Sequence, residues 1–458
     1  MNNYLKLYFS TMRIYLRTAI CLLVSGIYLK QGIKAQPSLA KIDQIVNQYI
    51  KPNESGGVLL LARGDKILHH KAYGLASKEL NIPMKTVNTF RIASMTKQFV
   101  AVCILTLEEQ GKLSLEDDIR KYVPEFPDKG ETIRIKHLLS HTSGIKNLTS
   151  IGNYPEYMKK VVTLSELISY FKNEPLEFVP GSKNSYSNSG YILLHHIIEK
   201  LSGMSLNDYM QKYLFGKIGV TTARVEADNE IIPNKASGYI NEHMTADYMS
   251  MTQIACLVMC AEDMFRWHRG LYAGKIISKQ NLQKAQSGFR LNDGTYTDYG
   301  FGWGIKVLNG DTLIEHGGGI SGYGGYEVYL PKEDIFAVFL DNSQSRPEDL
   351  ILYKAISAVS KSKLINEIHL TTEQRKKYIG QYQFGDTKTE IVEKNGRLYL
   401  NGRYKGASWP IRFTALNTFY IEEQYPFEYT FITDENDKIT EIILKGRGGY
   451  EERAKRIN

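Results

Sequence analysis

The sequence predicts an α/β plus all-α arrangement followed by a small all-β domain. Three observations indicate this. Two strand patterns open the chain after residue 57, a mostly helical stretch fills about 112–290, and strands return from Thr312 before a closing helix. Beyond about residue 370, short strand patterns alternate with turn signals to the C-terminus. A chain of 458 residues with 43% hydrophobic content is long enough for two domains.

The N-terminal segment reads as a secretory signal peptide. Lys6, Arg13 and Arg17 precede an apolar run over 19–29, and Ala35 ends a plausible cleavage site. The run is short for a membrane-spanning helix. We therefore expect residues 1–35 to be removed and the protein to be secreted or periplasmic, with retention as an uncleaved anchor as the alternative.

The first two strands are expected at 58–61 and 66–73, joined by a turn at 63–65. Ser94-Met95-Thr96-Lys97 follows and opens an apolar helix that runs to about Gly111. Residues three apart share a helix face, so Lys97 is expected beside the Ser94 hydroxyl. This spacing recurs elsewhere in the chain, and the helix N-terminus distinguishes Ser94, because backbone N–H groups there favour negative charge.

Two further groups of residues complete a constellation. Tyr186-Ser187-Asn188 follows a Pro-Gly turn and precedes a helix expected over 190–201, which carries His195 and His196. Glu315-His316-Gly317-Gly318-Gly319 ends a strand pattern that begins at Asp311. A serine needs a neighbouring base to become a nucleophile, and a glycine-rich strand lets a substrate lie against the backbone.

With these residues in order, the chain resembles a serine beta-lactamase-related hydrolase of the penicillin-recognising superfamily, on its class C beta-lactamase, D-aminopeptidase and esterase branch. Supporting segments include 135–144 and 299–304, and the resemblance covers about 40–345. It implies an antiparallel sheet flanked by helices, with a helical insert and Ser94 at the junction. The expected domains are 36–365 for the hydrolase and 370–458 for a small β-barrel or meander, similar to lipocalin-like accessory modules.

The resemblance implies a role for each residue of the constellation. Ser94 would form an acyl-enzyme, Lys97 would hold a proton near it, and Tyr186 would be the general base. Asn188 would bind Lys97, and the backbone N–H groups of Ser94 and Gly319 would form the oxyanion hole. The remaining assignments are His316 as a catalytic residue that tunes the base, and substrate binding at Gly317 and Gly318.

One departure bears on the substrate. Beta-lactamases and D,D-peptidases usually carry Lys-Thr/Ser-Gly where this chain has His316-Gly317-Gly318. The charge of a histidine is conditional near neutral pH, so a fixed cation for a substrate carboxylate is missing. This favours other esters or amides. A D,D-peptidase or beta-lactamase, and a catalytically silent binding or sensor protein, are the alternatives.

Other function classes find little support in the sequence. Its net charge of +8 permits association with an anionic cell envelope, but no Lys/Arg-rich run predicts nucleic-acid binding. No G-x-S-x-G, H-E-x-x-H or P-loop occurs. We expect no metal or cofactor, and a small-molecule or peptide substrate. Cys103, Cys256 and Cys260 are predicted to be buried small hydrophobes, while the oligomeric state has no signature in the sequence.

Overall fold

A six-stranded antiparallel sheet forms the centre of the larger lobe, in the order β10-β11-β12-β13-β1-β2. The computed structural model describes residues 39–227, 230–246, 256–403, 406–422, 425, 427–446 and 451–457. Strand β1 pairs with β13 from Gly57 opposite Asp341 to Arg63 opposite Ile335, so two distant parts of the chain close one sheet. The six strands are β1 (Gly57–Arg63), β2 (Lys66–Tyr73), β10 (Gly304–Leu308), β11 (Asp311–Ile320), β12 (Tyr323–Leu330) and β13 (Ile335–Asp341).

Both faces of this sheet are covered. Successive side chains of a strand point to opposite faces, and β1 is buried along almost its whole length. Val58 and Leu60 enter a core shared with the helical insert, whereas Leu59 and Leu61 enter a second core beneath α2 (Leu39–Val46) and α11 (Glu348–Val359). The continuous apolar run over 58–61 therefore reflects a strand buried on two sides.

The helical insert separates the two parts of the sheet. Its longest helices are α3 (Thr96–Glu109), which is buried over its first twelve residues, and α7 (Asn188–Ser202). The other helices are α4 (Ile135–Leu139), α5 (Tyr154–Tyr157), α6 (Leu164–Phe171), α8 (Leu206–Tyr213), α9 (Ala261–Tyr272) and α10 (Lys279–Ala285), with 3₁₀ turns η1 (Ala93–Met95), η2 (Ile119–Lys121), η3 (Leu148–Ser150) and η4 (Phe215–Lys217). Short strands are β3 (Leu75–Ser77), β4 (Ile82–Pro83), β5 (Phe90–Arg91), β6 (Arg224–Val225), β7 (Tyr239–Asn241), β8 (Met244–Thr245) and β9 (Leu257–Met259), and η6 (Pro331–Glu333) links β12 to β13.

The C-terminal part is a closed antiparallel barrel, in which β14 pairs with β21. Its interior is filled by aromatic and aliphatic side chains, including Tyr382, Phe419 and Phe431. The predicted fold class, a flanked antiparallel sheet followed by a small all-β domain, is confirmed. The elements are α12 (Thr372–Lys376), β14 (Gly380–Phe384), β15 (Thr387–Lys394), β16 (Arg397–Asn401), β17 (Ser408–Ala415), β18 (Thr418–Ile421), β19 (Glu428–Thr433), β20 (Ile439–Lys445) and β21 (Glu451–Arg456).

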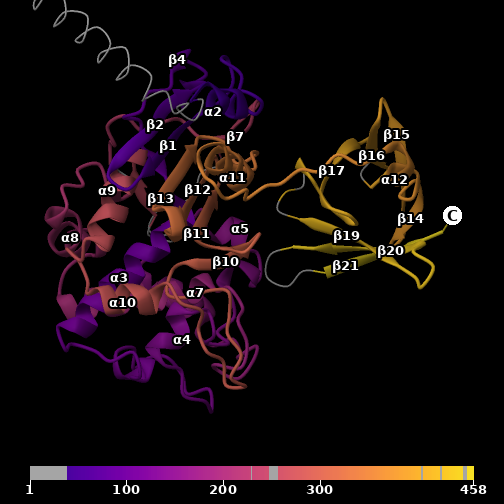
Figure 1. Ribbon diagram of the computed structural model, residues 1–458. Coiled ribbons are helices and arrows are strands. Elements are labelled where there is room, and N and C mark those ends of the chain that lie inside the picture. The colour runs from indigo at the N-terminus through magenta and orange to yellow at the C-terminus, as the bar shows by residue number, and fades with distance from the viewer. Residues whose placement is uncertain are drawn as a thin grey trace, which may run out of the picture.

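The barrel forms a separate lobe that contacts the larger one near α11 (Figure 1). Lys354 of α11 pairs with Glu422 of the barrel, and the Tyr49 hydroxyl donates to the same carboxylate at 3.1 Å. The rings of Tyr353 and Tyr425 meet edge-on, with centroids 6.3 Å apart. We call this contact between Tyr49, α11 and Glu422 the barrel dock.

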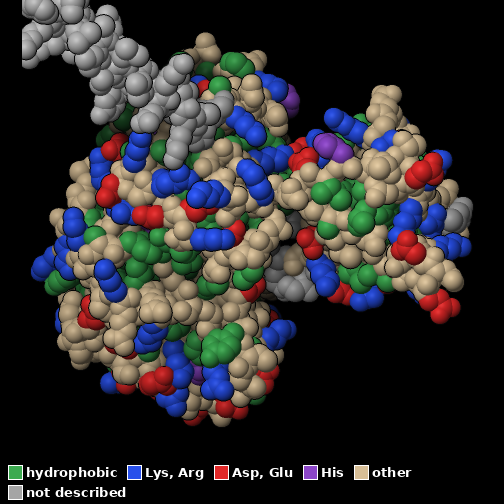
Figure 2. Space-filling view, in the orientation of Figure 1, with side chains coloured by type: hydrophobic (Ala, Val, Ile, Leu, Met, Phe, Trp, Pro, Cys, Tyr) green, Lys and Arg blue, Asp and Glu red, His purple; other side chains and the backbone are tan. Residues whose placement is uncertain are grey.

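Charged side chains of both signs are intermingled on the face of the molecule in Figure 2. Among the described residues, no helix is long and apolar enough to cross a membrane. The predicted signal peptide, residues 1–35, lies outside the described residues.

Candidate active site

Ser94 lies in a single 3₁₀ turn, η1, immediately before α3. Its neighbour Ala93 has a φ of +48°, a left-handed conformation that non-glycine residues rarely adopt. The Ala93 N–H donates to the Cys256 sulfur at 3.3 Å, and the Ile92 N–H donates to the Leu257 carbonyl at 3.0 Å. The surrounding structure thus holds a strained turn in place, as is often seen at functional sites.

Lys97 lies one helical turn from Ser94 and is buried. Its Nζ donates to Ser94 Oγ at 3.2 Å and to Asn188 Oδ1 at 2.9 Å. The ammonium also lies 4.8 Å from the ring centroid of Tyr186. The predicted proximity of Ser94, Lys97, Asn188 and Tyr186 is therefore present, with Lys97 at its centre.

Asn188 is the first residue of α7, and a second asparagine orients its side chain. Asn147 Oδ1 accepts from the Asn188 backbone N–H at 3.2 Å and from Asn188 Nδ2 at 3.4 Å. Since the amide nitrogen is engaged there, the amide oxygen faces Lys97. Sequence reasoning did not identify Asn147, because it lies 41 positions away from Asn188 in a loop without a distinctive motif.

Tyr186 projects partly into solvent, with 40% of its surface exposed, and its ring lies against His141 with centroids 4.3 Å apart. His141 is buried, and its Nδ1 accepts from the Ser187 N–H at 3.2 Å, so the proton of a neutral ring is on Nε2. Burial, with the nearby charge of Lys97, holds the pKa of His141 well below its usual range. A neutral ring therefore supports Tyr186. The sequence placed His141 in a structural segment without indicating this contact.

His316 is fixed by contacts on both ring nitrogens. Nδ1 lies 2.7 Å from the Gly317 carbonyl oxygen, and Nε2 lies 2.9 Å from the Tyr299 hydroxyl. A carbonyl only accepts, so Nδ1 carries hydrogen; when the ring is neutral, the Tyr299 hydroxyl donates to Nε2. Burial raises the pKa of Tyr299 well above its usual value, which keeps that hydroxyl protonated. The sequence contained Tyr299 in a family segment but gave it no role.

Strand β11 brings the three glycines to the Ser94 turn. Strand β10 pairs only with residues 311–315 of β11, so the edge from His316 onward is free of β10. A methyl group on Gly318 would lie 2.2 Å from the Ile92 carbonyl oxygen and 3.1 Å from the Ser94 nitrogen. Gly318 is therefore required for close packing of β11 against the Ser94 turn. Gly319 lines the cavity described next, whereas Gly317 and Gly318 do not.

A cavity of about 560 Å³ opens beside Ser94. Ser94, Lys97, Asn188 and Gly319 line one end of it, and Tyr186 and His316 lie outside its lining. Most of the rest of the lining is apolar and comes from α3, η3, α5 and the residue after it, α6, α7, the β7–β8 hairpin and β11: Val100, Leu148, Tyr154, Pro155, Met158, Leu164, Leu167, Tyr191, Ile192, Ile240 and Ile320.

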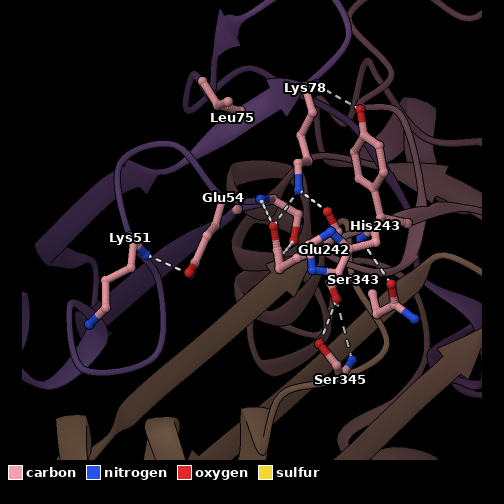
Figure 3. Close-up of polar contacts among 12 residues, drawn as sticks. Lys51, Glu54, Leu75, Lys78, Glu242, His243, Ser343 and Ser345 are labelled. Carbon is pink, nitrogen blue, oxygen red and sulfur yellow. Dashed lines mark hydrogen bonds and ion pairs between the residues drawn. The ribbon is translucent and has the colours of Figure 1, made fainter.

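The hairpin that carries Ile240 into the cavity is fastened by Glu242 (Figure 3). The Glu242 carboxylate accepts from Lys78 Nζ at 2.6 Å, from the Ser55 N–H at 3.1 Å and from Arg346 Nη2 at 3.1 Å. Arg346 Nη1 also donates to both carboxylate oxygens of the buried Asp341, at 2.8 and 2.9 Å. This network joins the hairpin to Asp341 at the end of β13, three positions before the lining residue Gln344.

The described residues contain no group of three or more His, Cys, Asp or Glu side chains placed to hold a metal ion. Cys103, Cys256 and Cys260 are buried free thiols, and burial raises the pKa of Cys256 to about 12. The Cys256 thiol therefore supports the Ala93 N–H as a neutral group.

Comparison with known proteins agrees with this geometry. Residues 42–360 match the model of the Beta-lactamase family. The chain belongs to the beta-lactamase family. It is 30% identical over 382 residues to Penicillin-binding protein 4* of Bacillus subtilis (strain 168), covering 76% of this chain and 84% of that protein. The recognised family, the serine beta-lactamase-related hydrolases, is thereby confirmed.

Two solved structures share the fold of this chain. The octameric penicillin-binding protein homologue from Pyrococcus abyssi aligns with a TM-score of 0.66 at 22% identity, covering 91% of this chain and 99% of that one. The D-amino acid amidase from Ochrobactrum anthropi SV3 aligns with a TM-score of 0.61 at 22% identity, covering 70% and 97%. The first of these alignments extends through most of the C-terminal barrel as well.

Proposed function

We propose that this protein is a serine hydrolase that cleaves an ester or amide bond through an acyl-enzyme on Ser94. The observation that carries the proposal is the position of Lys97 Nζ, which donates to both Ser94 Oγ and Asn188 Oδ1. A cation held between the nucleophile and an amide oxygen favours loss of the serine proton. Membership of a hydrolase family supports the same reaction class.

In the first half-reaction, Ser94 Oγ attacks the substrate carbonyl carbon while its proton passes to the phenolate oxygen of Tyr186, directly or through Lys97. The backbone N–H groups of Ser94 and Gly319 stabilise the negative oxygen of the tetrahedral intermediate. The bond to the leaving group then breaks, and Tyr186 returns the proton to that group. In the second half-reaction, water attacks the acyl-enzyme with Tyr186 as base and regenerates Ser94.

Asn188 positions Lys97 in this scheme, and His141 positions the Tyr186 ring. His316 tunes the site through the Tyr299 hydroxyl, since a neutral His316 ring supplies no cation for a substrate carboxylate. This favours esters and amides without a carboxylate beside the scissile bond. The substrate that we propose is a small molecule or peptide. We propose that the protein meets it in a secreted or periplasmic setting near the cell envelope, after its own residues 1–35 have been removed.

A second candidate function is D,D-peptidase or beta-lactamase activity. The identity of 30% to Penicillin-binding protein 4* favours it, whereas His316 in place of the usual lysine does not. Steady-state hydrolysis of a chromogenic beta-lactam distinguishes the two. Turnover as fast as that of the enzyme's preferred simple ester would support the second candidate.

The test of the proposal is intact-mass analysis after treatment with a fluorophosphonate probe. We expect one adduct on the wild type and none on Ser94→Ala, with hydrolysis of p-nitrophenyl esters lost in parallel. Ser182→Ala, an exposed serine in the turn before Tyr186, is the matched control and should react like the wild type. A folded wild type without an adduct would instead indicate a silent binding protein.

A further inference from the structure

We infer that the cavity beside Ser94 is an acyl-chain site, and that the preferred substrates are esters or amides of apolar acyl groups about eight carbons long. This inference rests on the proposed function and specifies its substrate class. It draws on three observations: the side of the site on which Tyr186 lies, the composition of the cavity and its length along α7.

The position of Tyr186 decides which part of the substrate enters the cavity. In the proposed reaction Tyr186 protonates the leaving group, so the leaving group must lie near its hydroxyl. Tyr186 is outside the cavity lining and is partly exposed to solvent. Ser94, Lys97 and Gly319 line the cavity end where the carbonyl carbon would sit. The leaving group therefore points to solvent and the acyl group points into the cavity.

The cavity lining suits a hydrocarbon chain. Leu148 and Leu167 are almost fully buried, and partly buried Met158, Leu164 and Ile192 pack against the same core. Ligand sites of 300–1,000 Å³ with mostly apolar walls bind ligands chiefly through burial of apolar surface. Among the described lining residues none is acidic.

Two lining residues with basic side chains, Lys159 and His195, are already paired with carboxylates. His195 Nε2 lies 3.1 Å from the Glu199 carboxylate, and Lys159 Nζ lies 2.9 Å from the Glu156 carboxylate. Since these groups are satisfied within the protein, a chain that reaches them needs no polar end to bind.

The wall formed by α7 sets the length. Asn188, Ile192 and His195 line the cavity at successive turns of this helix. Seven residues of α-helix rise about 10 Å, which is close to the length of an extended acyl chain of about eight carbons. Asn188 is at the Lys97 end, so the chain would extend from Ser94 along α7 towards His195.

The experiment measures kcat/KM for p-nitrophenyl esters from acetate to decanoate. We expect kcat/KM to rise roughly fourfold per methylene, as burial of each CH₂ predicts, and to level off near octanoate. A second series, acetyl esters of alcohols of increasing length, should be nearly flat. Flat or falling values in the acyl series would overturn the inference, as would a steep alcohol series, which would place the leaving group in the cavity.

Variants on α7 localise the effect. Ile192→Trp fills the middle of the cavity and should lower the octanoate-to-acetate ratio of kcat/KM at least tenfold while acetate is still hydrolysed. Leu201→Trp, at a half-buried position on the same helix outside the lining, is the matched control and should keep the wild-type ratio. Should Ile192→Trp fail to fold, Ile192→Ala should move the optimum to longer chains; an unchanged optimum would contradict the inference.

The two proposals fail in different ways. Ester hydrolysis that persists in Ser94→Ala refutes the proposed function. Hydrolysis that depends on Ser94 but is fastest with acetate leaves that function standing and refutes only the acyl-chain site.

Discussion

Gly318→Ala is the sharpest test of how β11 supports catalysis. The added methyl would lie 2.2 Å from the Ile92 carbonyl oxygen, whereas real Cβ contacts essentially never fall below 3.0 Å. The Ser94 turn and β11 must therefore separate by about 1 Å, a misplacement that commonly lowers the rate of an enzyme about 100-fold. That factor corresponds to about 2.7 kcal/mol of transition-state stabilisation.

The assay is kcat/KM for a p-nitrophenyl ester, with thermal unfolding followed by circular dichroism to establish that the variant is folded. Gly304→Ala, on the neighbouring strand β10, is the control, because its methyl would meet the Glu315 carbonyl oxygen at an ordinary 3.4 Å. We expect that control to retain activity within threefold. A folded Gly318→Ala protein with similar activity would refute the argument that β11 must touch the Ser94 turn.

Three further predictions concern carboxylates. Burial raises the pKa of Glu327 to about 7 from 4.5, so the stability contributed by its neutral form is complete below pH 4.5 and is lost as the pH rises through 7. In urea unfolding, the unfolding free energy of Glu327→Gln relative to the wild type should therefore rise by about 3 kcal/mol between pH 5 and pH 9, and an equal difference at both pH values would contradict this. Glu242→Gln removes the charge that faces Lys78 and Arg346 and should cost about 2 kcal/mol of unfolding free energy and raise KM, which an unchanged denaturation midpoint would exclude. Glu422→Gln weakens the barrel dock and should speed subtilisin cleavage within 361–379, the segment that connects the two lobes. An unchanged cleavage rate would show that other contacts hold the dock.

Much of the larger lobe was predictable because its elements have local signals. The expected helix over 190–201 is α7, although the helix begins two residues earlier and so includes Asn188. The expected strand 312–315 is the first half of β11, which continues through the glycines to Ile320. Glycines have low strand propensity, so pairing with β12, not local preference, extends the strand.

The sequence patterns predict barrel strands over 378–382, 389–392, 397–400, 418–422, 430–433 and 439–444. They miss β17 and β21. Strand β17 contains Pro410, which argues against a strand in a sequence pattern, and β21 reads Glu-Glu-Arg-Ala-Lys-Arg with only Ala454 buried. Closure of the barrel supplies the partners that these strands need, and such long-range pairing has no local signature.

In the candidate site, too, some residues were predictable from the sequence and others were not. Ser94, Lys97, Tyr186 and Asn188 were found from spacing and resemblance, and the structure brings them together. Their supports were not found, because a contact such as that between Cys256 and the Ala93 N–H depends on packing across 163 positions. Likewise Cys260 at the start of α9 makes no side-chain capping bond, and Asp263 in the first turn instead accepts from the Thr221 and Thr222 N–H groups, while Thr222 Oγ1 accepts from the Cys260 N–H.

The two-sided burial of the central sheet separates two kinds of sequence change. Ser94 and its cavity lie on the face that Val58 and Leu60 share with the helical insert, and the barrel dock lies beyond α11, on the face of Leu59 and Leu61. Substitutions in the cavity and at the dock share no side-chain partner, so their effects on unfolding free energy should add to within about 0.5 kcal/mol. Substrate preference and barrel attachment are therefore free to diverge independently among proteins built on this plan.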